Sequence, residues 1–140
     1  MLSSSMNNLI PARFLILLSH LTISIIILWS RDGNVKACLP YDYENEEYTK
    51  RDFQLLIGLC LAIGFIGFEL LAFISGISMF MPTVSILSII CHASASILLS
   101  KSLLDEWDCR IYWWIFTFCS IIPFILEIGV FINVLALQRF

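Results

Sequence analysis

Four long apolar runs dominate this 140-residue chain and restrict the folds open to it. A helix needs about 20 residues to cross a hydrocarbon core about 30 Å thick, and each run can reach that length. The runs lack the strict alternation of lipid-facing strands, and four strands cannot close a barrel in a bilayer. The sequence therefore predicts an all-α membrane protein. It forms a single bundle of four transmembrane helices, near residues 10–30, 53–74, 83–100 and 111–136.

Composition supports a membrane protein and argues against several classes of function. Apolar residues make up 59% of the chain and charged residues 14%, whereas soluble domains average about 45–50% and about 25%. A net charge of −3 without a basic tract argues against a nucleic-acid partner. The sequence shows no nucleophile–base pair, phosphate-binding loop or clustered histidine motif. We therefore expect a protein that is not an enzyme, with no catalytic residue, cofactor or metal.

The segments outside the four runs are short. The first run is interpreted as a retained helix, because its apolar stretch is long and WSRDG (29–33) offers no small-residue cleavage site for a signal peptidase. The residues up to about Arg13 are expected to form a loose polar arm. Four spans place both termini and the second loop on one face. The first loop, residues 31–52, is the largest segment outside the bilayer and shares the other face with the third loop.

Two signals disagree over which face is cytoplasmic. All four tryptophans fall at the face of the first and third loops, as an interfacial aromatic belt would place them. Those loops also hold most of the basic residues, while the other face has only Arg13 and Arg139. A count of basic residues therefore puts the loops in the cytoplasm. The cysteines of the first and third loops favour the opposite orientation, because a disulfide between these loops would require an oxidising compartment outside the cytoplasm. We therefore expect the termini to be cytoplasmic.

Two of the five cysteines lie in loops on the same face: Cys38 in the first loop and Cys109 in the third. A bridge between them would tie the long loop to the start of the fourth helix and would require an oxidising compartment. It also needs a Cα separation under about 7 Å. We predict this disulfide; the alternative is two free thiols near the lipid headgroups.

Ionisable side chains fall inside all four predicted helices, and they form the predicted buried polar core: His20, Glu69, His92 and Glu127. Such groups cost about 2.5–3.5 kcal/mol to insert and often mark function. Glu69 and Glu127 occupy similar positions on two helices that run in the same direction. One interpretation is a proton or metal path. The other, which we favour, is a bundle core held together by hydrogen bonds.

Three further patterns concern packing. Gly58 and Ala62 are spaced four apart, which lets helix backbones approach closely. Pro123 predicts a kink in the fourth helix. A four-residue spacing predicts one polar stripe on the third helix, formed by Ser88, His92, Ser96 and Ser100.

The ordered set of these features resembles the transmembrane protein 107 family. No one segment is a chemical motif, but together the segments span nearly the whole chain. They are RFLILLSHL (Arg13–Leu21), WSRDGNVKACLP (Trp29–Pro40), EEYTKRDFQL (Glu46–Leu55), ELLAFISGISMF (Glu69–Phe80), HASAS (His92–Ser96) and WDCRIYWWIFTFCSIIP (Trp107–Pro123).

The resemblance implies a role at the base of the cilium. Members of that family reside in the membrane of the ciliary transition zone. They act with the Meckel syndrome module, which includes tectonics, B9-domain proteins and other small membrane proteins, and they restrict which membrane proteins enter the cilium. The positions that match the family's pattern include Cys38, Glu69, His92, Cys109 and Glu127, and the resemblance implies a catalytic role for none of them.

The chain departs from the family pattern in its tail, where Arg139 stands in place of a more basic cluster.

Two further expectations remain. One is that the protein associates with itself into a homo-oligomer. The buried residues also allow a second functional class, a small proton- or ion-coupled transporter or channel subunit that uses Glu69 and Glu127.

Overall fold

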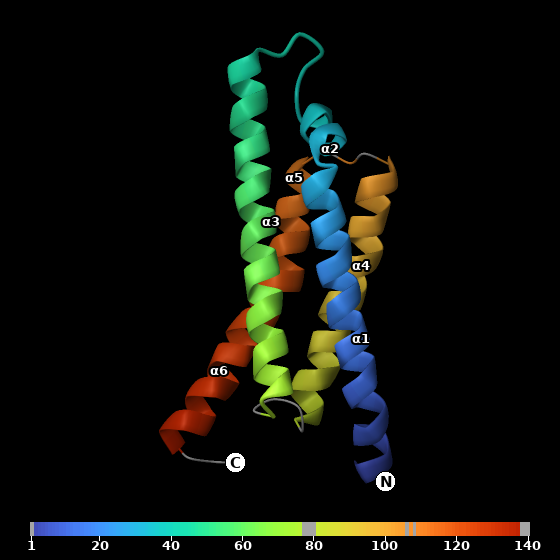
Figure 1. The fold of residues 1–140 in the computed structure, drawn as a ribbon, viewed down its shortest axis with the longest axis vertical. Helices are drawn as coiled ribbons and strands as arrows, with labels where there is room; N and C mark the ends of the chain where they lie inside the picture. The colour runs from blue at the N-terminus through green and yellow to red at the C-terminus, as the bar shows by residue number, and fades with distance from the viewer. Residues whose placement is uncertain (1, 77–80, 106, 108, 138–140) are drawn as a thin grey trace.

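Each of the four apolar runs forms a helix long and apolar enough to cross a membrane, and Figure 1 shows their arrangement. The computed structural model describes residues 2–76, 81–105, 107 and 109–137, and the side chains of 7–76, 81–105, 107 and 111–136. Across these ranges the regular structure is helical, without a strand, which confirms the predicted all-α fold. The elements are α1 (Leu2–Trp29), α2 (Asp32–Ala37), α3 (Asn45–Ile74), α4 (Pro82–Asp105), α5 (Cys109–Phe116), the π-helix η1 (Thr117–Ile121) and α6 (Ile122–Leu137).

The helices extend beyond the predicted spans. α1 begins at Leu2, so the stretch before Arg13, expected to be loose, is helical instead. α3 begins at Asn45 rather than near residue 53, because acidic side chains at Glu46 and Glu47 suit the positive end of a helix dipole. The loop expected over residues 31–52 is therefore shorter, and it contains the small helix α2.

α3 ends at Ile74, and the chain turns two residues later at a position whose backbone demands glycine. Gly76 has a φ of 87°, a left-handed conformation that glycine adopts without steric cost. Its amide donates to the carbonyl of Phe73 at 3.1 Å, which satisfies one of the open carbonyls at the helix end. Pro82 then opens α4, at a position where a missing backbone N–H costs nothing.

The fourth span changes helix type before its proline. α5, η1 and α6 follow one another without a break, and the π-helix ends at Ile121, two residues before Pro123. Proline cannot donate the hydrogen bond of an α-helix, and π-turns are a common cause of helix bending. Figure 1 shows α6 leaving the direction of α5 and diverging from the rest of the bundle towards the C-terminus.

The start of α1 and the end of α6 lie at one end of the bundle, and α2 lies at the opposite end (Figure 1). α1 packs on α4 and α3, while α3 and α4 also contact the fourth span. An apolar core fills the half of the bundle nearest α2. It contains Ile27, Val35, Leu55, Leu59, Ala62, Ala95, Leu99, Tyr112, Ile115, Phe116 and Cys119, and we call it the apolar layer.

Close packing within the apolar layer depends on one small residue. A Cβ atom built on Gly58 would lie 2.9 Å from Cε1 of Tyr112 and 3.2 Å from Cη2 of Trp113. The rings of Tyr112 and Trp113 on α5 therefore pack directly against Gly58 on α3, and a larger residue there would require the rings to shift. On the outside, large apolar side chains such as Leu15, Leu71 and Ile97 are exposed, as expected of surfaces that face lipid.

Candidate functional site: a buried ionic cluster

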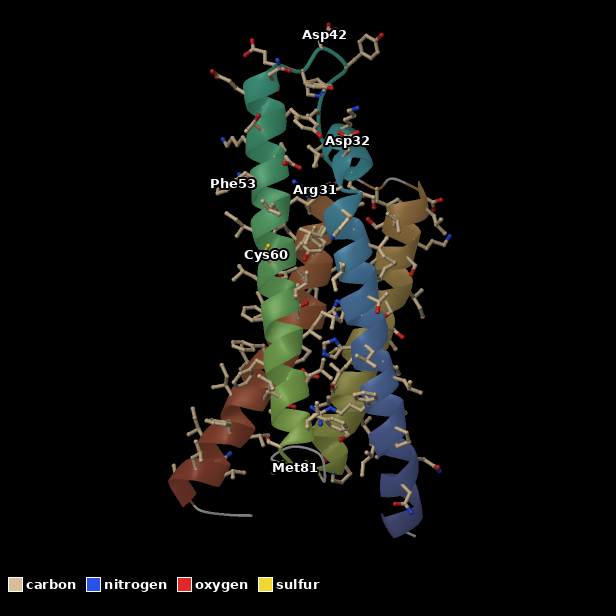
Figure 2. The ribbon with its side chains drawn as sticks, viewed as in Figure 1. Arg31, Asp32, Asp42, Phe53, Cys60 and Met81 are labelled. Carbon is tan, nitrogen blue, oxygen red and sulfur yellow. The ribbon has the colours of Figure 1, made fainter. Side chains whose placement is uncertain are left out.

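Charged and polar side chains fill the half of the bundle nearest the chain ends. Each is 3% exposed or less, and they come from all four spans. Figure 2 shows nitrogen and oxygen atoms gathered between the ribbons in this half, away from the labelled Asp42. We call this group the ionic cluster: Arg13 and His20 on α1, Glu69 on α3, Ser85, Ser88 and His92 on α4, and Glu127 on α6.

Arg13 joins four helices. Its Nη2 atom pairs with Oε1 of Glu127 and lies 3.7 Å from Oε2 of Glu69. Its Nη1 atom is 3.5 Å from Oγ of Ser85, and its guanidinium carbon lies 5.2 Å from the centre of the Phe73 ring. A guanidinium suits this position because its fork of donors can serve several acceptors at once.

Arg13 was expected outside the membrane, in the polar arm, and that expectation is wrong because the side chain is fully buried. One signal in the sequence could have found it. Arg13 lies seven residues before His20, which places both on one face of a helix. Leu17 and Ser24 continue this buried face along α1.

Glu69 is the acceptor at the centre of the ionic cluster. Oγ of Ser88 donates to its Oε2 atom at 2.6 Å. The Nε2 atom of His92 lies 3.1 Å from Oε2 and 3.2 Å from Oε1. The carboxyl group therefore receives hydrogen bonds from α4 and a positive charge from α1, so it is held by two neighbouring helices.

The two histidines contact each other through like atoms. Nδ1 of His20 lies 2.6 Å from Nδ1 of His92, and the ring centres are 4.9 Å apart. Two ring nitrogens at this distance must share one hydrogen, because two lone pairs or two N–H groups would repel. The contact fixes the relative tautomers of the pair: when one Nδ1 carries the proton, the other accepts it.

The polar stripe on α4 differs from the predicted one. Ser88 and His92 are buried, but Ser96 and Ser100 are only half-buried, and their hydroxyls donate to carbonyls of their own helix. With 3.6 residues a turn, each four-residue step rotates by about 40°, so the stripe leaves the core. The buried face instead includes Ser85, Ser88, His92 and Ser102.

The ionic cluster does not extend through the bundle. Ser24, one turn after His20, is fully buried, and its hydroxyl oxygen has no hydrogen-bond partner among the described residues. Beyond it lies the apolar layer, with Leu59 and Leu99 each 1% exposed or less. Among the described residues, Ser120 on η1 is also buried, and a further set of polar contacts lies past this layer, beside α2.

The α2 end is held by a second, smaller set of polar contacts. Nδ2 of Asn34 lies 3.0 Å from the carbonyl oxygen of Ser102 and 2.8 Å from that of Trp107. The guanidinium of Arg31 donates to Asp52, with Nε and Oδ1 2.6 Å apart. These contacts tie α2 and the end of α1 to α3 and α4, and Figure 2 labels Arg31 at this end.

Asp32 is exposed on the same end of the bundle. The hydroxyl of Tyr48 donates to its Oδ1 atom, and Nζ of Lys36 lies 3.0 Å from Oδ2. The hydrogen bond from Tyr48, followed by that from Lys36, lowers the pKa of Asp32 from 3.8. The carboxylate form is therefore favoured where α2 meets the start of α3.

The cysteines divide into two groups. Cys38 is disulfide-bonded, whereas Cys60, Cys91 and Cys119 are free. The side chain of Cys109 lies outside the described side chains, so the pairing of Cys38 with Cys109 stays a prediction. Helix α2, which Cys38 directly follows, contacts α5, the helix that begins at Cys109.

Comparison with known proteins decides the family. The TMEM107 family model, described as a transmembrane protein, matches residues 9–131. Transmembrane protein 107 of Mus musculus is 48% identical over 133 residues, which is 95% of each chain. The chain belongs to the transmembrane protein 107 family. The Homo sapiens protein is 45% identical over the same share, and the Danio rerio protein is 41% identical over 89% of this chain and 93% of its own. No solved structure matches.

The geometry limits the chemistry open to this member of the family. Within the described part of the chain, no group of three or more histidine, cysteine or acidic side chains is arranged to hold a metal ion. The names of the relatives describe membrane proteins and name no reaction. The ionic cluster has groups that exchange protons and form ion pairs, and it connects all four spans.

Proposed function

We propose that this protein is a non-enzymatic membrane component of the ciliary transition zone that helps to assemble the Meckel syndrome module. In this role it gates the membrane-protein composition of the cilium and supports cilium assembly. Membership of the transmembrane protein 107 family, with matches over 95% of the chain, carries the proposal. The proposed partners are tectonics, other small multi-span proteins and B9-domain proteins, with the termini of the chain in the cytoplasm.

The large share of the described residues that lies in the four spans supports a role within the bilayer. Nearly all described residues lie in four spans or directly beside them, and the outward faces carry large exposed apolar side chains. Such faces can pack against other membrane helices as well as against lipid. In the proposed mechanism, this protein and its membrane-protein partners pack laterally into a ring at the base of the cilium. The crowded ring slows the diffusion of other membrane proteins.

The α2 end offers the largest surface outside the bilayer for partner recognition. Asp42, Glu44, Glu46 and Glu47 are all exposed there, before and within the first turn of α3. A surface with this charge favours a partner that presents basic residues. We assign this face to contacts with the extracellular parts of other transition-zone membrane proteins.

Localisation tests the proposal directly. The tagged protein is imaged in ciliated cells beside a basal-body marker and an axoneme marker. We expect a ring at the proximal end of the cilium, lost when Meckel-module partners are removed. In cells that lack the native protein, Asn7→Ser, an exposed position in the first turns of α1 at the opposite end of the bundle, serves as a control that restores cilia. Uniform signal in the plasma membrane or endoplasmic reticulum, with normal cilia after deletion, would contradict the proposal.

A second function is favoured by one observation, the ionic cluster. Its carboxyls and imidazoles are groups that proton-coupled transporters use, so a small proton- or ion-coupled transporter or channel subunit is the alternative. The apolar layer argues against it, because Leu59 and Leu99 close the bundle on the α2 side. Proton flux into liposomes that contain only this protein, abolished by Glu69→Gln, would favour the alternative.

A further inference from the structure

A pocket of about 210 Å³ lies where the chain leaves α2 and runs beside the start of α3. Its walls carry charges of both signs: one carboxylate and two cationic groups, all from α3, across from the residues that follow α2. The lining residues are Cys38, Leu39, Pro40, Glu47, Lys50 and Arg51. This α2–α3 pocket lies at the opposite end of the bundle from the ionic cluster.

The three charged side chains of the pocket lie on one face of α3 and are not paired with one another. Lys50 and Arg51 follow Glu47 by three and four residues, a spacing that places side chains on the same side of a helix. Among the described residues, none of the three forms a side-chain hydrogen bond or ion pair. The pocket therefore presents two positive charges and one negative charge to a ligand.

The neighbouring acidic groups are already bound to other side chains. Asp52 accepts from the guanidinium of Arg31, with Nε and Oδ1 2.6 Å apart. Asp32 accepts from the hydroxyl of Tyr48 and lies 3.0 Å from Nζ of Lys36. Each of these carboxylates has a partner outside the pocket, which leaves the two cations of the pocket available.

The pocket lies at the depth of the lipid headgroups. The apolar run of α3 begins at Phe53, and the preceding Asp52 pairs with Arg31, just past the end of α1. Figure 2 labels Arg31 and Phe53 at a similar height of the bundle. With a rise of 1.5 Å per residue, Arg51 lies about 3 Å outside Phe53 and Glu47 about 9 Å outside it. The headgroup layer is about 5–7 Å thick on each side of the hydrocarbon core, so the cations are level with lipid phosphates and the carboxylate lies at the outer edge.

We propose that the α2–α3 pocket binds the headgroup of a zwitterionic phospholipid, with its phosphate against Lys50 and Arg51 and its ammonium group against Glu47. The order of charges along α3 supports this ligand, because a phospholipid also carries its phosphate nearer to the hydrocarbon and its ammonium farther out. Guanidinium and ammonium groups are strong donors to phosphate oxygens. Binding involves no covalent step, and the inference does not depend on the ciliary role proposed above.

The carboxylate of Glu47 selects among phospholipids. A primary ammonium has three N–H groups that can donate to it, whereas the methyl groups of choline cannot. An anionic headgroup such as phosphatidylglycerol offers no cation, so the carboxylate would lie beside a second negative charge. The pocket should therefore prefer phosphatidylethanolamine over both phosphatidylcholine and phosphatidylglycerol.

The test is lipid binding to the purified protein in detergent micelles, measured by native mass spectrometry. Phosphatidylethanolamine should be held at least about five-fold more tightly than phosphatidylglycerol. Binding of phosphatidylglycerol that is as tight or tighter would indicate a general attraction to basic side chains and would overturn the proposal. Displacement of the lipid by equimolar free phosphorylethanolamine would assign the pocket to a soluble ligand and would overturn its assignment to a lipid.

Variants on α3 test whether the lipid occupies this pocket. Arg51→Gln should weaken phosphatidylethanolamine binding at least about five-fold, because the phosphate loses a charged donor. Glu47→Gln should abolish the preference over phosphatidylglycerol, since the phosphate contacts remain and the contact to the ammonium is lost. Lys101→Gln, exposed near the end of α4, is the matched control and should change neither value. Equal binding to Arg51→Gln and to the unmodified protein would place the lipid elsewhere and overturn the proposal.

Discussion

The guanidinium of Arg13 on the first helix pairs with the carboxyl of Glu127 on the last, across 114 positions of the sequence. Both side chains are 1% exposed or less. Because α6 diverges from the bundle after Pro123, this pair is a specific polar contact between the two ends of the chain. It fixes where the last helix lies relative to the first.

Loss of one partner of this pair should destabilise the bundle strongly. We expect Arg13→Leu to lower the free energy of unfolding by about 3–5 kcal/mol, because the carboxyls of Glu69 and Glu127 lose the charge that balances them. The double variant Arg13→Leu, Glu127→Leu should recover part of that loss. Unfolding in detergent micelles, followed by circular dichroism, measures both. Lys50→Gln is the control, and a double variant no more stable than the single one would argue against a direct pair.

The contact of Gly58 with Tyr112 makes a second prediction. Gly58→Ala adds a methyl group that overlaps a buried ring, so the free energy of unfolding should fall by about 1–3 kcal/mol. Gly64→Ala is a matched control on the same helix, where an added Cβ meets nothing within 4 Å. It should be neutral or slightly stabilising, because alanine favours a helix. The same unfolding assay applies, and equal effects of the two changes would contradict the packing of the Tyr112 ring on Gly58.

The number and type of the spans could be predicted from the sequence because the bilayer imposes them. A hydrocarbon core leaves the backbone no partner except itself, so an apolar run of sufficient length becomes a helix. The same argument identified Glu69, His92 and Glu127 as candidate site residues. An ionisable side chain inside an apolar span costs free energy, so its presence indicates a specific role. Which groups these residues contact depends on how the helices rotate and pack, and no single run contains that information.

Arg13 shows where this reasoning stops. A basic residue near the end of a span is typical of an interfacial anchor, and the sequence alone does not separate that role from a buried pair. Its partners, Glu127 and Glu69, lie on other helices and become visible only in the folded bundle. Asn34 was missed for a related reason, because its role depends on the carbonyl groups of Ser102 and Trp107.

Asn34 supports the third prediction. It is 4% exposed, and its amide nitrogen is the donor to two carbonyl oxygens at the α4 end. Asn34→Ala leaves those acceptors without this donor and should lower the free energy of unfolding by about 1–3 kcal/mol. Asn45→Ala, at the exposed start of α3, should have little effect. Hydrogen exchange of the α2 amides gives a second readout: it should rise in the first variant only, and unchanged protection would contradict the role assigned to Asn34.

Asp32 and Tyr48 predict a dependence on pH at the α2 end. The hydrogen bond from Tyr48 lowers the pKa of Asp32 below 3.8, so the folded protein holds this proton less tightly than the unfolded chain. The resulting stabilisation is present above the unfolded value and is lost as the pH falls through the lowered one. Tyr48→Phe removes the donor and should raise the pKa of Asp32 towards 3.8. A carbonyl ¹³C titration measures it; Tyr41→Phe, which alters a fully exposed ring, should leave it unchanged.

The last prediction concerns the disulfide of Cys38. If its partner is Cys109, the bond links the end of α2 to the start of α5, and these two helices are in contact. Alkylation with a heavy maleimide should then label two more thiols after reduction than before it. Cys38→Ser and Cys109→Ser should each remove this difference, whereas Cys60→Ser, which alters a free cysteine, should preserve it. A difference that survives Cys109→Ser would assign Cys38 another partner. No difference in the unmodified protein would remove the argument for an oxidising compartment on the α2 side.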